Sequence, residues 1–227
     1  MEAIILAGGR GTRLASRLNG IPKPMASVAG RPFLELLLDE LQRSGVTRVL
    51  LSVGHLRHVI IDHFGAMYRD IHIEYVVEEQ PLGTGGAIRL ALARAHTPQV
   101  FVVNGDTFLQ LDYAAMLAAH TRDSATLTMA SAHLQDIGRY GGLVTDHTGR
   151  IVAFSEKGTT GPGRINAGVY VLNRDVSWFG LPDAFSFETD FLMPHLNDIA
   201  PRAYPTDGLF LDIGIPEDLD QAQTLLA

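Results

Sequence analysis

Short apolar runs alternate with amphipathic stretches over the first half of the chain. Buried parallel strands are predicted for the apolar runs 2–6, 49–53, 71–77 and 100–104. Helical spacing of the apolar residues between them predicts helices over 33–41, about 56–64, and 87–95. Strands and helices in this order, with short connections, indicate parallel βαβ units wound right-handed. The loops that follow such strands meet at one edge of the sheet, where α/β proteins bind ligands.

The alternation becomes less regular after residue 110. Here the pattern predicts helices over 112–120, 187–196 and 216–226, and strands over 125–130, 142–145, 151–155, 167–172 and 209–214. The turn Asp146-His147-Thr148-Gly149 joins two of these strands as a hairpin. The prediction is one α/β domain over 1–227, a Rossmann-like mixed, mostly parallel sheet flanked by helices, with halves of about 1–110 and about 111–227. No hexapeptide repeat follows, so no C-terminal β-helix is expected.

Composition narrows the class of protein. Hydrophobic residues make up 46% and charged residues 19%, which is an ordinary globular balance. The net charge of −7 argues against non-specific nucleic-acid binding, and the absence of cysteine excludes disulfides and thiolate metal sites. The sequence shows neither a signal peptide nor an apolar run of membrane length. We therefore expect a soluble, cytoplasmic protein with no membrane partner.

The first predicted strand runs into a glycine-rich loop, Leu6-Ala7-Gly8-Gly9-Arg10-Gly11-Thr12-Arg13-Leu14. Three glycines within four positions let the backbone turn sharply and approach a ligand, and successive N–H groups form an anion-binding concavity. Arg10, Arg13 and, from Pro22-Lys23-Pro24-Met25, Lys23 add positive charge to an otherwise acidic chain. The loop is predicted to cradle a polyphosphate. The alternative is a tight turn with solvated arginines.

Better-known motifs fit this loop poorly. It lacks the Gly-x-x-x-x-Gly-Lys-Ser/Thr of a P-loop, and Leu14 breaks the Gly-x-Gly-x-x-Gly of dinucleotide-binding proteins. A dinucleotide-dependent oxidoreductase and a non-catalytic nucleotide sensor remain as alternatives, although the first leaves Lys23 unexplained. His55, His58 and His63 lie close together without a His-Glu-x-x-His pattern, which indicates a solvated helix face rather than a zinc site.

Two aspartates are also predicted to lie at the ends of strands. Asp106 and Asp212 each end a predicted strand, and two carboxylates with phosphate oxygens suit Mg²⁺ or Mn²⁺. The alternatives are a turn-forming Asp106 and an Asp212 that caps the last helix.

The loop Glu79–Gly86 is predicted to hold a nucleobase, since its glycines would let a flat ring lie against the backbone. A simple loop capped by Thr84 is the other interpretation.

Taken together, these segments resemble the sugar-1-phosphate nucleotidyltransferases. The resemblance is carried in family order by Leu6–Leu14, Pro22–Met25, Glu79–Ala87, Asn104-Gly105-Asp106, Tyr140-Gly141, Glu156-Lys157, Asn166–Tyr170 and Asp212–Glu217. Ala15–Ile21 departs from the family, because many members have Pro-Leu-Thr just before Pro-Lys-Pro. This departure, together with the segments Pro32–Glu35 and Pro81–Gly86, makes the chain most similar to the D-glycero-D-manno-heptose 1-phosphate guanylyltransferases.

The resemblance implies that GTP and a heptose 1-phosphate react to GDP-heptose and pyrophosphate, for surface polysaccharide synthesis, with Mg²⁺ or Mn²⁺ as cofactor. It makes Arg13 and Lys23 catalytic, and Asp106 and Asp212 metal ligands. Nucleotide contacts are assigned to Leu6, Ala7, Gly8, Gly9, Arg10, Gly11, Thr12, Arg13, Glu79, Pro81, Gly83, Thr84 and Asp106. Sugar-phosphate contacts are assigned to Asn104, Tyr140, Gly141, Glu156, Lys157, Asn166 and Gly168 in the more β-rich half. Mannose 1-phosphate with GTP, another sugar with UTP or CTP, and a homodimeric assembly stay open.

Overall fold

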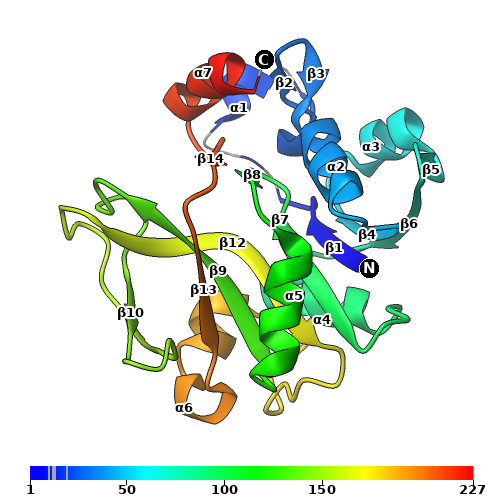
Figure 1. The fold of residues 1–227 in the computed structure, drawn as a ribbon. Helices are drawn as coiled ribbons and strands as arrows, with labels where there is room; N and C mark the ends of the chain where they lie inside the picture. The colour runs from blue at the N-terminus through cyan, green and yellow to red at the C-terminus, as the bar shows by residue number, and fades with distance from the viewer. Residues whose placement is uncertain (10, 12–13, 19, 227) are drawn as a thin grey trace.

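One mixed sheet of eight strands runs through the whole molecule (Figure 1). The computed structural model describes residues 1–9, 11, 14–18 and 20–226. In spatial order the strands are β13 (Arg202–Thr206), β9 (Leu127–Leu134), β12 (Gly163–Asn173), β7 (Gln99–Asn104), β1 (Glu2–Leu6), β4 (Arg48–Val53), β6 (Ile71–Val77) and β5 (Met67–Tyr68). Strands β7, β1, β4 and β6 are parallel, as are β13 and β9, whereas β12 and β5 run antiparallel to their neighbours. The predicted mixed, mostly parallel sheet is confirmed.

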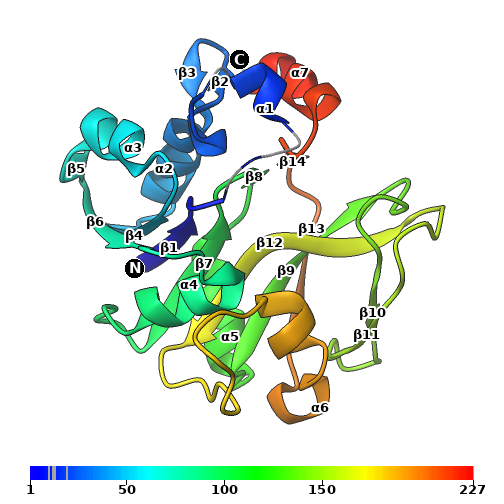
Figure 2. The same ribbon diagram turned by 180° about the vertical axis from the view of Figure 1, so that it is seen from behind.

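Helices cover both faces of this sheet, which Figures 1 and 2 show from opposite sides. One face carries α2 (Phe33–Arg43), α3 (Arg57–Phe64) and α5 (Tyr113–Arg122), and the other carries α4 (Gly83–Leu92), η3 (Phe187–Leu192) and α6 (Leu196–Ile199). The alternation of side chains along β1 explains its apolar run. Ala3 and Ile5 pack into one core and Ile4 into the other, so the strand is buried on both faces and only Leu6, at its end, is partly exposed.

Smaller elements lie above the sheet edge that the first loop approaches. They are α1 (Ala15–Leu18), η2 (Lys23–Met25), the β2 (Ser27–Val28) and β3 (Arg31–Pro32) pair, and α7 (Pro216–Leu225). Strand β8 (Thr107–Leu109) pairs antiparallel with β14 (Phe210–Asp212), which brings residues a hundred positions apart side by side. Strands β10 (Leu143–Thr145) and β11 (Ile151–Phe154) form the predicted hairpin.

Several predicted boundaries are wrong. Helix α4 begins at Gly83 rather than residue 87. Glycines in its first turn suggested a loop, but they allow the helix to pack closely against a neighbouring segment. The predicted helix 187–196 is two short helices, η3 and α6, with residues 193–195 between them. Strand β9 begins and ends later than 125–130, and β12 is longer than 167–172 at both ends. None of the described helices has both the length and the apolar character needed to cross a bilayer.

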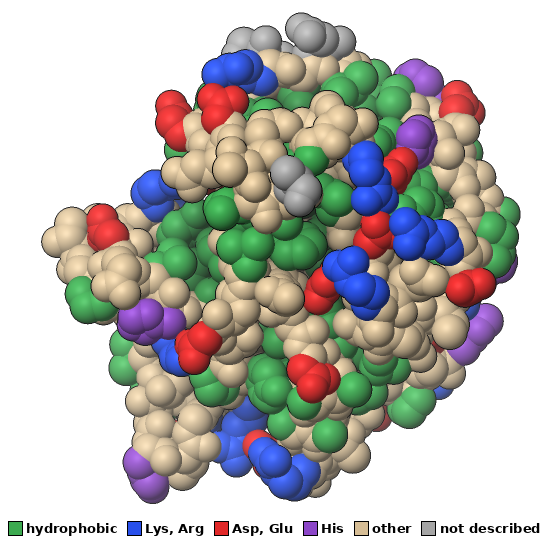
Figure 3. Space-filling view, turned by 45° about the horizontal axis from the view of Figure 1, so that its top comes forward, with side chains coloured by type: hydrophobic (Ala, Val, Ile, Leu, Met, Phe, Trp, Pro, Cys, Tyr) green, Lys and Arg blue, Asp and Glu red, His purple; other side chains and the backbone are tan. Residues whose placement is uncertain are grey.

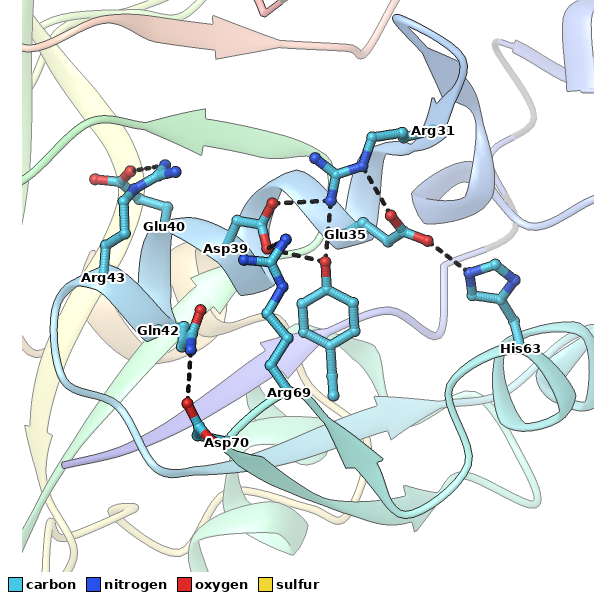
Figure 4. Close-up of polar contacts among 10 residues, drawn as sticks. Arg31, Glu35, Asp39, Glu40, Gln42, Arg43, His63, Arg69 and Asp70 are labelled. Carbon is cyan, nitrogen blue, oxygen red and sulfur yellow. Dashed lines mark hydrogen bonds and ion pairs between the residues drawn. The ribbon is translucent and has the colours of Figure 1, made fainter.

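A network of charged side chains ties α2 to β3 and β5 (Figure 4). Arg31 donates to the carboxylates of Glu35 at 2.9 Å and Asp39 at 2.8 Å, and to the Tyr68 hydroxyl at 3.0 Å. His63 Nε2 lies 2.8 Å from the other oxygen of Glu35. None of these side chains lines the cleft described below, and we assign the network a role in stability.

Candidate active site

A cleft of about 780 Å³ opens at the carboxyl ends of the parallel strands. Most of its lining comes from the segments that follow β1, β4, β6 and β7. Strands β4 and β6 extend the sheet on one side of β1, and β7 lies on the other, so the strand order reverses direction at this point. Such switch points are where open α/β sheets bind ligands. On the face drawn in Figure 3, basic side chains lie beside acidic ones.

The glycine-rich loop forms one wall of the cleft. Leu6, Ala7, Gly8, Gly9 and Gly11 line it as predicted. A Cβ at Gly8 would come within 2.5 Å of the Glu78 carboxylate, whereas one at Gly9 would meet nothing within 4 Å. Gly11 has a φ of +58° and packs against the base of Lys23. Arg10, Thr12 and Arg13 lie outside the described residues, so the predicted catalytic role of Arg13 remains a prediction.

The buried side chain of Lys23 contacts Asp106 in the same cleft. Lys23 lies on η2 between Pro22 and Pro24, and its side chain is only 9% exposed. Its Nζ donates to Asp106 Oδ2 at 2.6 Å. Asp106 occupies the tight turn between β7 and β8, and both residues line the cleft. The structure therefore brings together one predicted catalytic residue and one predicted metal ligand.

Asp212 reaches the same place from the other end of the chain. It lies directly opposite Thr107 in the β14–β8 pair, and the Ile213 N–H donates to the Asp106 carbonyl at 3.0 Å. Burial and the negative charge of Asp106 raise the pKa of the Asp212 carboxyl above its usual value, although the charge of Lys23 opposes them. Two carboxylates that repel each other in this way favour a bound cation.

These two carboxylates fit a divalent cation that is shared with a substrate. In the part of the chain that the structure describes, no three acidic or histidine side chains gather as a complete metal site. Asp106 and Asp212 would thus supply two oxygen ligands, with phosphate oxygens and water completing the set. This is the usual way that Mg²⁺ binds at nucleotide sites.

The Glu79 segment and the start of α4 form the opposite wall. Glu79, Pro81, Gly83 and Thr84 line the cleft, as predicted. The glycines of this segment also pack closely against a neighbouring segment of the chain. A Cβ would come within 2.5 Å of the Phe185 carbonyl from position 83 and within 2.1 Å of the Phe185 ring from position 85. They allow the segment before η3 to cross the helix, and the predicted contact of this loop with a nucleobase remains a prediction. Thr84 Oγ1 accepts a hydrogen bond from the Phe187 N–H at 2.9 Å.

The geometry described so far combines a glycine wall, a lysine and two carboxylates at a strand-order switch. Residues 2–227 match the Nucleotidyl transferase family over nearly the full chain. The chain belongs to this family. The predicted resemblance to nucleotidyltransferases is thereby confirmed.

Individual relatives are similar over the whole length. A D-glycero-alpha-D-manno-heptose 1-phosphate guanylyltransferase of Aneurinibacillus thermoaerophilus is 40% identical over 98% of this chain and 97% of its own. One of the same name from Campylobacter jejuni is 38% identical, with 96% of each chain covered. The crystal structure of HddC from Yersinia pseudotuberculosis complexed with GMP-PN is 37% identical, with a TM-score of 0.90 over 100% of this chain and 99% of that one.

The predicted sugar-phosphate residues of this family member divide into two groups. Asn104 lines the cleft, and Gly168 makes room for it, because a Cβ at 168 would lie 2.7 Å from the Asn104 amide nitrogen. The Asn166 amide nitrogen donates to Tyr170 and Glu188, which both line the cleft. These contacts make β12 a wall of the site.

The second group lies beside the cleft rather than among the residues that line it. The Tyr140 ring packs edge-on against Phe210 of β14, and burial together with the Asp212 charge raises the pKa of its hydroxyl to about 12. Gly141 has a φ of +78°, and a Cβ there would meet the Ser155 carbonyl at 2.6 Å. The absence of a side chain at Gly141 lets the segment that carries Glu156 and Lys157 pack close to it. The side chains of Glu156 and Lys157 are exposed.

Sequence reasoning missed some cleft residues. His55 and Arg57 line the cleft, although the histidines were interpreted as a helix face. His55 in fact precedes α3, in the loop after β4, and the position of that loop after a parallel strand was the available signal. Phe187 and Glu188 also line the cleft. No local pattern singles them out, because only the packing of η3 on α4 brings them there.

Proposed function

We propose that this protein transfers a guanylyl group from GTP to D-glycero-α-D-manno-heptose 1-phosphate, giving GDP-heptose and pyrophosphate. The observation that carries the proposal is the Lys23–Asp106 pair in a cleft shared with the glycine wall, with Asp212 next to Asp106 although it does not itself line the cleft. The substrate pair is supported by full-length similarity to two heptose 1-phosphate guanylyltransferases and to a HddC structure with GMP-PN.

The reaction needs no covalent enzyme intermediate. An oxygen of the sugar phosphate, already an anion at neutral pH, attacks the α-phosphorus of GTP, and the bond to the bridging oxygen of the departing pyrophosphate breaks. The chain then contributes positioning and charge neutralisation, as in other phosphoryl-type transfers. The ammonium group of Lys23 reduces the repulsion between the two approaching phosphates in this proposal. Backbone N–H groups of the glycine wall bind the leaving pyrophosphate, and Arg13 is proposed to assist them.

We assign Asp106 and Asp212 to a Mg²⁺ ion, which Mn²⁺ could replace. When bound, such an ion neutralises phosphate charge and orients the phosphate oxygens. The ordinary place of such a reaction is the cytoplasm, where nucleoside triphosphates are made. The product suits surface polysaccharide synthesis, and a homodimer is the assembly to test by light scattering.

The test is a grid of pyrophosphate-release assays with Mg²⁺. It crosses the four common ribonucleoside triphosphates with heptose, mannose, glucose and N-acetylglucosamine 1-phosphates. Release with GTP and the heptose phosphate supports the proposal, and release with a different pair keeps the reaction type but changes the substrates. No release from the folded protein with any pair would favour a non-catalytic nucleotide sensor.

Mannose 1-phosphate is the second candidate for the sugar. A mannose-1-phosphate guanylyltransferase of Mycobacterium tuberculosis is 38% identical over 178 residues, which are 78% of this chain but only 50% of that protein. The heptose relatives match this chain from end to end. The heptose phosphate therefore takes first place in the grid.

A further inference from the structure

Glu188 is a carboxylate of the cleft that the proposed reaction leaves without a role. It is the second residue of η3 and lines the same cleft as Lys23 and Asp106. Its side chain is exposed, whereas its neighbours Phe187 and Tyr170 are each only 1% exposed. An acidic side chain beside a site for two phosphate-bearing substrates is unfavourable for binding anions, so it calls for a different partner.

Two side chains, Asn166 and Tyr170, form a closed triangle of hydrogen bonds with Glu188. Asn166 Nδ2 donates to the Tyr170 hydroxyl at 2.7 Å and to Glu188 Oε1 at 3.1 Å. The Tyr170 hydroxyl donates to the same Oε1 at 3.3 Å. Asn166 Oδ1 in turn accepts from the Gly168 N–H at 3.0 Å. Both N–H groups of the Asn166 amide are thus used within the protein, and a direct contact from them to a substrate would break the triangle.

The triangle is anchored from two sides. Strand β12 carries Asn166 and Tyr170, and the Tyr170 ring packs edge-on against Phe187 at 5.1 Å between ring centres. The Phe187 N–H bonds to Thr84 at the start of α4. Glu188 Oε1 is therefore held in place. Within the described part of the chain, no hydrogen bond is found to Oε2, which leaves it able to accept from a ligand in the cleft.

We propose that Glu188 is a specificity-determining residue that accepts hydrogen bonds from hydroxyl groups of the sugar. Asn166 and Tyr170 are positioning residues that act through it. A carboxylate oxygen accepts strong hydrogen bonds from hydroxyl donors, and a polyhydroxylated sugar is the part of the two substrates richest in them. A site built to bond a hydroxyl also rejects an analogue that lacks it, because its own polar group is then left unpaired. This inference rests on the proposed function.

Steady-state kinetics of two variants test the inference. Glu188→Gln keeps the size of the side chain but removes its charge, so we expect the KM for heptose 1-phosphate to rise about 10-fold or more. The KM for GTP should stay within about twofold. Tyr170→Phe keeps the buried ring and removes the hydroxyl, and it should shift the same KM in the same direction by less. Asp175→Asn, an exposed aspartate in the loop after β12, is the matched control.

The outcomes separate this inference from the proposed function. A wild-type enzyme that turns over, together with a Glu188→Gln variant whose two KM values are unchanged, would overturn the role of Glu188 alone. A rise in the KM for GTP instead would also overturn it. If the wild type releases no pyrophosphate, saturation-transfer NMR with heptose 1-phosphate decides. A binding signal that the variant loses supports the role, and equal signals or none from both proteins reject it.

Discussion

Lys23 and Asp106 are 83 positions apart in sequence, and their side chains meet at 2.6 Å in the cleft. The lysine is nearly buried, with 9% of its side chain exposed, while the aspartate is 38% exposed. Without substrate, this aspartate is the partner that stabilises the buried ammonium group. When phosphates and a cation bind, the two residues can exchange partners. The ammonium group of Lys23 then contacts the phosphates, and the carboxylate of Asp106 binds the cation. The pair thus keeps a positive charge ready in the absence of ligand.

The first prediction concerns Lys23. Lys23→Met keeps most of the buried stem but removes the charge that we propose offsets phosphate repulsion. We expect kcat to fall about 10²–10³-fold, the typical cost of one charge-stabilising donor. Circular dichroism should show an intact fold, and Arg122→Met, at a guanidinium that is 72% exposed on α5, is the control. Turnover within about threefold of the wild type would remove Lys23 from the mechanism.

The second prediction separates activity from stability at Asp212. Burial and the charge of Asp106 raise the pKa of this carboxyl, so its ionised form is destabilised by the fold. Asp212→Asn removes that charge, and the free energy of unfolding should be unchanged or higher at pH 7. Pyrophosphate release should fall by at least about 10²-fold, because the proposed cation ligand is lost.

Urea unfolding with and without Mg²⁺ checks this prediction. The added ion should stabilise the wild type more than Asp212→Asn, since only the wild type has both carboxylates. A variant that is clearly less stable than the wild type would show that Asp212 contributes to the fold instead.

The order of buried strands made the sheet and the position of its cleft predictable from sequence. Residues directly after a strand, such as Gly9 and Asp106, could be placed at the sheet edge because parallel strands share a direction. The approach of Asp212 to Asp106 depends on the β14–β8 register, a contact between distant segments that no local pattern contains. The same is true of Glu188, which reaches the cleft through the packing of η3 on α4.

The glycines of α4 show the opposite problem. Gly83 and Gly85 have low helix propensity, and a local reading of them predicts a loop. In the structure the missing side chains give space to Phe185, so tertiary packing outweighs propensity. Sequence alone does not distinguish a glycine needed for a turn from one needed for a close contact.

The third prediction concerns the pH dependence of the Arg31 network. Burial alone would raise the pKa of Asp39, but hydrogen bonds from Arg31 and Tyr68 outweigh it and lower this pKa. The pKa of Glu35 is lowered in the same way, against burial, by His63 and Arg31. A lowered pKa in the folded state adds stability that is present above the unfolded-state value, near pH 4, and is lost as the pH falls through the folded-state value.

Arg31→Met should therefore cost about 1–3 kcal/mol of unfolding free energy at pH 7, because two carboxylates lose their shared donor. The cost should shrink near pH 3, where those carboxylates become protonated in both proteins. Urea titrations at the two pH values measure it. Arg43→Met serves as control, since Arg43 is 63% exposed and pairs with Glu40 on the same helix. An equal cost at both pH values would contradict the assignment of the effect to these ion pairs.

The last prediction compares Gly85, buried in α4, with Gly9, which lines the cleft. Alanine normally stabilises a helix by about 1 kcal/mol relative to glycine. At Gly85, however, the new Cβ would lie 2.1 Å from the buried Phe185 ring, so Gly85→Ala should instead lower the unfolding free energy by about 1–3 kcal/mol. At Gly9 the Cβ would meet no atom within 4 Å, and its φ lies outside the left-handed region, so stability should change by less than about 0.5 kcal/mol.

Gly9→Ala, which should leave stability unchanged, is expected to weaken nucleotide binding. The Cβ of Gly9→Ala would stand in the cleft, where the close approach of a phosphate to the backbone requires open space. We therefore expect a higher KM for GTP from a protein of unchanged stability, measured by pyrophosphate release and urea unfolding on the same preparation. If Gly9→Ala bound GTP normally, the glycine wall would not contact the phosphates, and the phosphate site would have to lie elsewhere in the cleft.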